Sequence, residues 1–165
     1  MGSPRNKNFV RIVLAAVIIS ILFFWLRDVF SGEEGRIRKF ILQGKKAAEA
    51  KDIVACAEMI SHDYRDKYGN DRQGLIYIGR RVLDYYKAIM IGIEKSDIKL
   101  DKPSKQADVE ITAMVLCQSP DKRTDKIFEG DRGRFRVRLL KQGGKWKLAE
   151  IEFLERLTIM GQDIL

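Results

Sequence analysis

The spacing of apolar residues changes once along this chain, near residue 89, and that change limits the folds that the chain can adopt. Before this point apolar residues recur every three or four positions, which predicts helices with one buried face. Beyond it they alternate with polar residues at a period of two, which predicts half-buried strands. Helices grouped ahead of strands are typical of an α+β fold and argue against alternating βαβ units.

Three helices are predicted before the change of period. The first covers about residues 36–50, and Asp52 caps a second helix that ends near residue 61. Asp71 caps a third helix that runs to about residue 88. The segment 61–70, between the second and third helices, has no period and is rich in turn-forming residues, so we expect an irregular loop there.

Four strands are predicted after the change of period. Ile98 and Leu100 belong to the first strand, and residues 109–117 form the second. The last two strands, about 126–140 and 146–156, flank a Gln-Gly-Gly turn.

The last hairpin also indicates its own register. A three-residue turn over residues 142–144 sets Phe135 beside Ile151 and Arg136 beside Glu150. Apolar residues then face apolar ones, and basic residues face acidic ones. A turn one residue shorter would set apolar residues against charged ones, so the pattern favours the three-residue turn. The same register pairs Val137 with Ala149, Arg134 with Glu152, and Leu140 with Trp146.

Three features together resemble the nuclear transport factor 2-like (NTF2-like, or SnoaL-like) superfamily. They are the order of the elements, the Ser61-His62-Asp63-Tyr64-Arg65-Asp66 loop after the second helix, and the closing Gly144-Lys145-Trp146-Lys147-Leu148 strand. The resemblance covers about residues 36–157 and implies a cone in which three helices pack on a curved antiparallel sheet of about four strands. The superfamily includes ketosteroid isomerases, small dehydratases and many non-catalytic domains.

A long apolar segment precedes this domain. From Phe9 to Leu26 the chain is apolar except at Arg11 and Ser20. The run without a charged residue, Ile12 to Leu26, has 15 residues and is shorter than the roughly 20 residues of a spanning helix, but Arg11 can snorkel and so extend it. Three consecutive aromatic residues near its end suit a membrane interface. We therefore expect one transmembrane helix that acts as an uncleaved signal anchor.

The chain is accordingly divided into a short basic tail over residues 1–8, an anchor over 9–27, a linker over 28–35 and an NTF2-like domain over 36–165. Cleavage after Ser31, as in a signal peptide, stays open as the alternative. Positive charges on the two sides of the anchor are nearly balanced, but the very short tail favours a cytoplasmic N-terminus. The domain is then expected outside the cytoplasm, in a bacterial periplasm.

Composition excludes several classes of protein. Hydrophobic residues make up 45% and charged residues 33%, which excludes a disordered tail, a collagen-like repeat and a polytopic membrane protein. Four basic residues and one acidic residue among residues 1–30 supply +3 of the net charge of +8, so the domain is only mildly basic. One histidine and two cysteines predict no metal site, and no nucleotide-binding motif occurs. We expect no cofactor, while Cys56 and Cys117 could form a disulfide or stay buried thiols.

The loop after the second helix carries the candidates for acid–base catalysis. In the isomerases and dehydratases that it resembles, an acid or base stands near the second helix, which points here to His62, Asp63 and Asp66. Tyr64 and Tyr86 are the candidates for contacts with a bound ligand. The alternative is that Asp63 and Asp66 organise the loop through Asx-type hydrogen bonds while His62 is exposed.

The chain departs from the isomerases at two positions of their catalytic machinery. Their first helix carries a tyrosine where this chain has Ile37, Phe40 and Ile41. Their central strand carries an acid where residues 113–116 are apolar here. A non-enzymatic role is therefore the expectation.

A candidate interaction surface lies on the last hairpin. In the register above, Leu140 and Trp146 pair on the outer face near Arg138, and an exposed patch of this kind suits a protein partner. Residues 132–147 are rich in Lys and Arg, but alternation places Arg134, Arg136 and Arg138 on one strand face and the register gives two of these three glutamate partners, so we expect no nucleic-acid binding. Contact of this basic stretch with anionic lipid head groups is a looser alternative.

These observations favour a membrane-tethered, non-enzymatic NTF2-like domain that acts through protein contacts, as a homodimer or as a component of an envelope assembly. An anchor followed by this fold is also similar in layout to the assembly-factor subunits of bacterial type IV secretion systems. The alternative is a small-molecule-binding or isomerase- or dehydratase-like pocket inside the cone.

Overall fold

The computed structural model describes residues 32–101, 103, 105–120, 129–155, 158–159 and 162–163. The predicted anchor and the alternative cleavage site lie outside these residues. Within them, none of the helices combines the length and the apolar character that a membrane span requires. The chain divides into two compact units, residues 1–36 and 37–165, and the second unit holds the α+β fold that the sequence predicts.

The chain forms the three predicted helices, α2 (Glu33–Glu49), α3 (Ile53–Met59) and α4 (Arg72–Tyr85). Both predicted caps are present. The Asp52 side chain accepts a hydrogen bond from the Ala55 N–H at 3.0 Å, and Asp71 accepts one from the Gly74 N–H at 2.8 Å. Helix α2 begins three residues before its predicted start, since two glutamates in its first turn interact favourably with the helix dipole.

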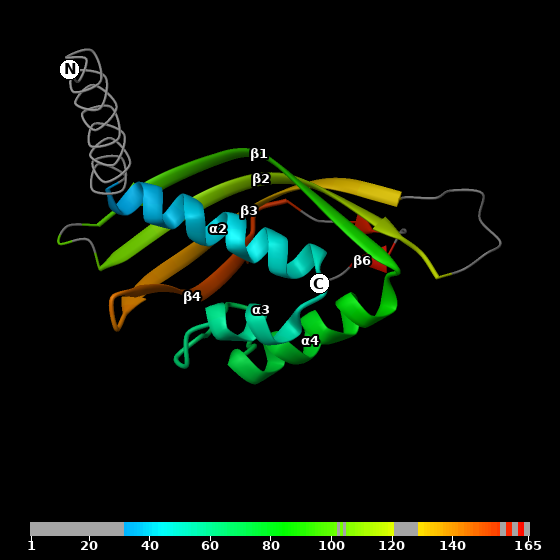
Figure 1. Ribbon diagram of the computed structural model, residues 1–165, viewed down its shortest axis with the longest axis horizontal. Helices are drawn as coiled ribbons and strands as arrows, with labels where there is room; N and C mark the ends of the chain where they lie inside the picture. Colours follow the sequence, from blue (N-terminus) through cyan, green and yellow to red (C-terminus); the bar gives the residue numbers. More distant parts are fainter. Residues whose placement is uncertain are drawn as a thin grey trace, which may run out of the picture. The chain divides into compact units, whose positions relative to one another are not determined.

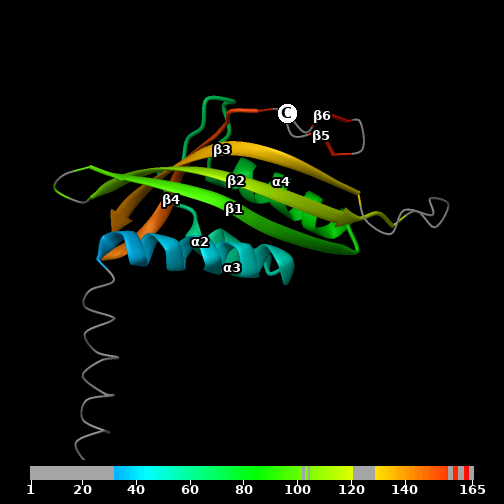
Figure 2. The same ribbon diagram turned by 90° about the horizontal axis from the view of Figure 1, so that it is seen from above.

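The four predicted strands form one antiparallel sheet in the order β1-β2-β3-β4 (Figure 1). They are β1 (Ala88–Leu100), β2 (Gln106–Gln118), β3 (Glu129–Gln142) and β4 (Lys145–Phe153). In both views the strands arch over α2 (Figures 1 and 2). Two short strands that the sequence analysis did not predict, β5 (Thr158–Ile159) and β6 (Gln162–Asp163), pair with each other.

The register of the last hairpin differs from the prediction. Gln142 pairs with Lys145, so the turn contains only Gly143 and Gly144, and the predicted three-residue turn is wrong. Both glycines have a positive φ, 56° and 78°, as a two-residue type I′ turn requires. Glycine adopts this conformation without a clash from a Cβ atom, so the Gly-Gly pair permits the tighter turn.

A bulge in β4 then restores the pairing that the shorter turn would have disturbed. Leu139 pairs with Leu148, but the preceding Arg138 pairs with Glu150, so Ala149 is an extra residue in β4. Beyond this bulge, apolar residues again face apolar ones and arginines again face glutamates. The pairs are Val137 with Ile151, Arg136 with Glu152, and Phe135 with Phe153, in place of the predicted ones.

The main core lies between α2 and the inner face of the sheet. Ile37 is fully buried at this contact, and Phe40 and Ile41 pack beside it. Val109 of β2 and Leu139 of β3 are fully buried at the centre of the sheet face. A second apolar cluster joins the end of α4 to the first two strands and consists of Leu83, Tyr86, Ile89 and Cys117.

Trp146 belongs to the main core, and the prediction that it lies on the outer face is wrong. Its exposed fraction is 6%, and it pairs with Lys141 rather than with Leu140. Side chains alternate between the two faces of a strand, so a turn shorter by one residue moves this indole from the outer to the inner face.

The two cysteines are free thiols in the structure. Cys117 is buried and Cys56 is half-buried. Burial raises the pKa of both thiols, and the charge of Asp52 adds to this effect at Cys56. Both side chains are therefore protonated and weak nucleophiles at neutral pH.

Candidate functional site

The loop after α3 is held along the edge of β4. Ile60 forms a parallel bridge with Leu148, and the Ser61 N–H donates to the Leu148 carbonyl at 2.8 Å. The Arg65 N–H donates to the carbonyl of Ala149, the bulge residue, at 3.1 Å. These bonds give an aperiodic segment a defined conformation, and they cover part of an edge strand that would otherwise be open to pairing.

Asp66 holds the second half of this loop together. Its carboxylate accepts hydrogen bonds from the Tyr64 hydroxyl and the Tyr68 N–H, both at 2.9 Å. It also accepts bonds from the Asn70 N–H at 2.9 Å and from the Asn70 side-chain amide at 3.0 Å. Partial burial by itself raises the pKa of Asp66, but these hydrogen bonds outweigh it and hold the pKa below its usual range. Asp66 is thus an ionised acceptor that organises the loop, one of the two roles that the sequence left open.

Tyr64 is the buried partner of this carboxylate. Its side chain is 1% exposed, and its hydroxyl proton is donated to Asp66. Burial, followed by the hydrogen bond and the charge of Asp66, raises the pKa of Tyr64. The phenol is therefore neutral, and its single proton is already engaged within the protein.

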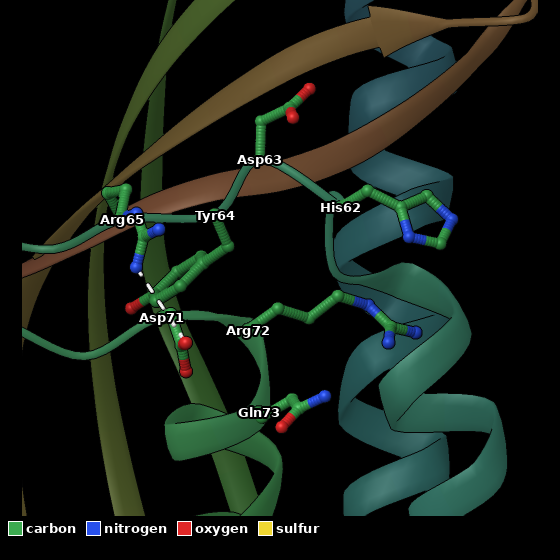
Figure 3. Close-up of a pocket in the computed structure, with 7 residues that line it drawn as sticks. All are labelled: His62, Asp63, Tyr64, Arg65, Asp71, Arg72 and Gln73. Atoms are coloured by element: carbon green, nitrogen blue, oxygen red, sulfur yellow. Dashed lines mark ion pairs between the residues drawn. The ribbon is translucent and has the colours of Figure 1, made fainter.

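A pocket of about 460 Å³ opens between this loop and the start of α4 (Figure 3). Three of the predicted candidates line it, namely His62, Asp63 and Tyr64. Four further lining residues were not predicted as site residues, although one lies within the loop and the other three are the cap and first residues of α4. They are Arg65, Asp71, Arg72 and Gln73.

The charged side chains around the pocket are engaged with other parts of the protein. Arg65 forms an ion pair with Asp71 at 3.7 Å. Arg72 donates to the carbonyls of Ala57 at 3.0 Å and Ile60 at 3.5 Å, which satisfies acceptors at the C-terminal end of α3. The pocket is polar, and these contacts give its arginines a structural role.

His62 and Asp63 do not form a catalytic pair. Figure 3 shows the Asp63 carboxylate turned away from Asp71 and Arg72, while the imidazole of His62 extends in a different direction. The Asp63 carboxylate accepts a hydrogen bond from Gln142 Nε2 at 3.4 Å, and both candidate side chains are exposed. Neighbours in the sequence are therefore not brought together in space for acid–base chemistry.

Tyr86 belongs to the second apolar cluster rather than to the pocket. Its ring packs edge to face against Tyr85, with the ring centroids 4.9 Å apart. It is not among the residues that line the pocket beside Tyr64. The two tyrosines predicted as ligand contacts are therefore not brought together at this pocket.

The described interior of the fold is almost entirely apolar. Among the described residues, the buried side chains that carry a polar group are Ser61, the phenols of Tyr64 and Tyr86, the Trp146 indole and the Cys117 thiol, and none of them is a carboxylate or an imidazole. The Ser61 hydroxyl donates to Gln142 Oε1 at 3.2 Å and accepts the Asp63 N–H at 3.1 Å. Ala113 of β2, one of the apolar residues that the sequence analysis set against an isomerase acid, is buried. This interior provides no acid–base pair for proton transfer within the described residues.

The arginines of β3 are paired with acidic residues on the outer face of the sheet. Arg136 bonds to Glu110 at 2.7 Å and to Glu152 at 3.2 Å. The hydrogen bond from Arg136 lowers the pKa of Glu110, so this pair is ionised at neutral pH. The prediction of paired charge is confirmed, with partners shifted by the bulge.

The predicted interaction surface is rearranged by the observed register. Arg138 lies between Asp108 at 3.2 Å and Glu150 at 2.7 Å. Leu140 is half-buried, and Trp146 faces the core. These three residues therefore do not form a joint exposed apolar patch, and a partner contact at Arg138 or Leu140 stays a prediction.

An exposed row on α4 was missed by the sequence analysis. Tyr77 and Tyr85 are 62% and 54% exposed. Arg81 lies between them in the sequence, and its guanidinium is 5.9 Å from the centroid of the Tyr77 ring. The spacing of four residues, which places all three on one face of the helix, is the signal that could have found them.

Comparisons with known proteins identify the fold and not a family. No family model matches the sequence, and no curated protein matches it. Solved structures do match the fold, among them a candidate scytalone dehydratase from Novosphingobium aromaticivorans. Its TM-score is 0.68 at 14% identity, over 80% of this chain and 88% of the other.

Two further solved structures are similar. A nuclear transport factor 2-like superfamily protein from Salmonella enterica has a TM-score of 0.63 at 11% identity, over 75% of this chain and 91% of its own. A candidate dehydratase of the NTF2-like family from Streptomyces avermitilis has a TM-score of 0.59 at 11% identity, over 73% and 94%. At these identities the likeness extends to the fold alone, and the predicted NTF2-like fold is confirmed.

Proposed function

We propose that this chain is a non-catalytic NTF2-like domain, tethered to a membrane by its N-terminal apolar segment, which acts by binding another protein. The observation that carries the non-catalytic part is the described interior, whose buried clusters consist almost entirely of apolar side chains and contain no carboxylate or imidazole. The loop candidates support it as well. Asp66 and Tyr64 bond to each other, while His62 and Asp63 diverge.

The tether is supported by the sequence of residues 9–26, in which Arg11 and Ser20 are the only interruptions. In this proposal the chain crosses the membrane once and the domain lies outside the cytoplasm. We expect the full-length protein to stay in the membrane pellet after alkaline carbonate extraction, and protease added to spheroplasts to digest the domain. Release by carbonate would contradict the tether, and protection from the protease would contradict the orientation.

A protein partner is supported by the exposed row of Tyr77, Arg81 and Tyr85 on α4. Tyrosine and arginine are enriched among the residues that dominate binding energy at protein interfaces. Two large aromatic side chains that are more than half exposed would gain apolar burial on association. The partner in this proposal is a second copy of the chain or another subunit of an envelope assembly.

Binding of a small polar ligand is the second candidate function. It is favoured by the pocket beside the loop, whose volume of about 460 Å³ falls within the range of small-molecule sites. Two of the similar structures are candidate dehydratases. A ligand in this pocket would contact the exposed side chains of His62, Arg65 and Gln73.

Native mass spectrometry of the full-length protein in mild detergent separates these two functions. Added protein mass supports the interaction role, whereas a small mass that is lost on denaturation supports the ligand pocket. Under the first proposal, Tyr77→Ala and Arg81→Glu remove the added protein mass, and the matched pocket variants His62→Ala and Asp63→Asn retain it. A small bound mass that disappears in the pocket variants alone would overturn the first proposal in favour of the second.

A further inference from the structure

Strand β3 is longer than its neighbour β4, and the difference leaves part of β3 with one unpaired edge. The last pair between the two strands is Phe135 with Phe153, whereas β3 pairs with β2 as far as Glu129. Among the residues that the structure describes, residues 129–134 of β3 therefore have a paired strand on one side only. Their other side is a free edge of the sheet.

The direction of the backbone groups at this free edge follows from Arg134. Its carbonyl accepts the Leu154 N–H at 2.9 Å and the Glu155 N–H at 3.2 Å, so it points away from β2. In an antiparallel strand the N–H and C=O groups of alternate residues point to the same side. Those of Gly130 and Arg132 therefore also point away from β2, toward the free edge.

The edge has little protection of its own. The Arg132 N–H donates to the carboxylate of its neighbour Asp131 at 2.7 Å. Gly130 has no side chain that could shield the edge, and a Cβ atom at this position would collide with the Leu116 side chain. Both Gly130 and Arg132 are exposed. An unpaired edge of this kind can pair with a strand of another molecule unless something covers it.

The segment that follows β4 begins at this edge. Glu155 forms an ion pair with Arg134 at 3.2 Å, in addition to its backbone bond. Thr158, the first residue of β5, comes only three positions later (158 minus 155). Strand β5 lies next to β3, and Figure 2 shows β5 and β6 on the side of β3 that faces away from β2. A short connection thus keeps residues 156–165 beside the free edge.

The sequence of this segment suits a strand. Residues 157–160, Leu-Thr-Ile-Met, include two β-branched residues and neither proline nor glycine. Ile159 and Gln162 are the pair next to the β5–β6 turn, so their backbone groups point at each other and those of Thr158 point away from β6. A strand held by so short a connection has an effective concentration of the order of millimolar, which favours it over a strand of another molecule.

We propose that the free edge of β3 at Gly130 and Arg132 is a strand-docking site, and that residues 156–165 of the same chain occupy it. In the structure β5 lies beside β3 and pairs with β6. Docking adds backbone hydrogen bonds between β5 and the edge, which extends the main sheet by one strand. The segment is then a strap that prevents the edge from pairing with a second copy of the chain. This inference goes beyond the proposed function and does not depend on the membrane tether.

The test is amide hydrogen exchange, measured by NMR on the full-length protein in detergent micelles. The amides of Gly130 and Arg132 report on the edge, while those of Asp131 and Gly133 face β2 and serve as internal controls. We expect all four amides to be protected in the native chain. Thr158→Pro removes a backbone N–H of β5 and should make exchange at Gly130 and Arg132 at least about tenfold faster, with the internal controls unchanged.

Thr158→Val is the matched control variant, because it keeps the N–H and the β-branched side chain, and it should leave all four rates unchanged. A synthetic peptide of residues 156–165, added at about 1 mM to the Thr158→Pro protein, should restore the protection of Gly130 and Arg132. Equal exchange at Gly130 in the native chain and in Thr158→Pro would overturn the inference. So would faster exchange at the internal controls as well, which indicates general loosening of the sheet.

Two further outcomes would overturn the choice of occupant. A peptide that does not restore protection would show that this segment is not the docked strand. Protection in the native chain that rises with protein concentration would assign the edge to a second copy of the chain, because pairing within one molecule does not depend on concentration.

Discussion

Replacing Asp66 with alanine tests whether this carboxylate organises the loop. In the structure it accepts one hydrogen bond from the Tyr64 hydroxyl and three from nitrogen atoms of Tyr68 and Asn70. The Tyr64 side chain is 1% exposed, so its hydroxyl would lose its partner with little access to water. Leaving this buried donor without a partner lowers the free energy of unfolding by about 1–3 kcal/mol. The three N–H donors lie nearer the surface and can bond to water instead, so each lowers it by about 0.5 kcal/mol or less. We expect the free energy of unfolding to fall by about 2–4 kcal/mol.

The assay is urea unfolding followed by the fluorescence of Trp146, which is buried in the core, in a Trp25→Phe background. The matched control is Asp63→Ala, an exposed carboxylate with one bond of 3.4 Å, which should change the free energy of unfolding by less than about 0.5 kcal/mol. Adding Tyr64→Phe to Asp66→Ala should recover part of the loss, because it removes the orphaned hydroxyl. If Asp66→Ala costs no more than Asp63→Ala, the structural role assigned to Asp66 is refuted.

The same carboxylate predicts a dependence on pH. The pKa of Asp66 is lower in the folded protein than its ordinary value of 3.8. Above the ordinary pKa the ionised carboxylate contributes its full stabilisation. This contribution is lost as the pH falls through the lower pKa that Asp66 has in the folded protein. The stability difference between the native chain and Asp66→Ala should shrink on acidification below about pH 4. A difference that grows in this range would contradict the assignment.

Further outcomes follow from the core, the turn and the thiols. Trp146→Ala should lower the free energy of unfolding by about 3–5 kcal/mol, and Arg136→Gln, at a half-exposed ion pair, should lower it barely detectably. Both variants are measured by urea unfolding followed by far-ultraviolet circular dichroism, and equal effects would contradict the inward position of the indole. Gly144→Val should lower the free energy of unfolding by about 1–3 kcal/mol, because φ is 78° at this position and a β-branched residue is strained there. An unchanged midpoint of urea unfolding would argue against the two-residue turn. Burial raises the pKa of the Cys56 and Cys117 thiols, so both should react slowly with iodoacetamide until denaturant is added. Fast labelling of both thiols in the folded protein would contradict their burial.

Features that depend on short stretches of chain were predictable from the sequence. The change of apolar period predicts helices before strands, and the fold has this order. The prediction holds because each helix and strand buries the face on which its apolar residues lie. The caps at Asp52 and Asp71 involve bonds across only three residues, so the residue type and its position suffice to predict them. The α+β class follows from this order of elements. The NTF2-like fold was implied by a resemblance that this order carries together with the loop after the second helix and the closing strand.

The register of the last hairpin was decided by the tertiary structure. A three-residue turn without a bulge and a two-residue turn with a bulge satisfy the same pattern of apolar and charged residues beyond Ala149. The second solution gains the Arg65 N–H as a donor to the Ala149 carbonyl, from a loop more than 80 residues earlier in the chain (149 minus 65 is 84). It also buries Trp146. Neither gain is visible in the hairpin sequence.

The roles of the loop residues were likewise decided in three dimensions. The sequence identified His62, Asp63, Tyr64 and Asp66 as a polar group but left catalysis and loop organisation open. Hydrogen bonds are directional, so the role of a carboxylate depends on which donors point at it and not on its neighbours in the chain. The fold aims four donors at Asp66 and turns Asp63 away from His62, because the segment that carries them is held along the edge of β4.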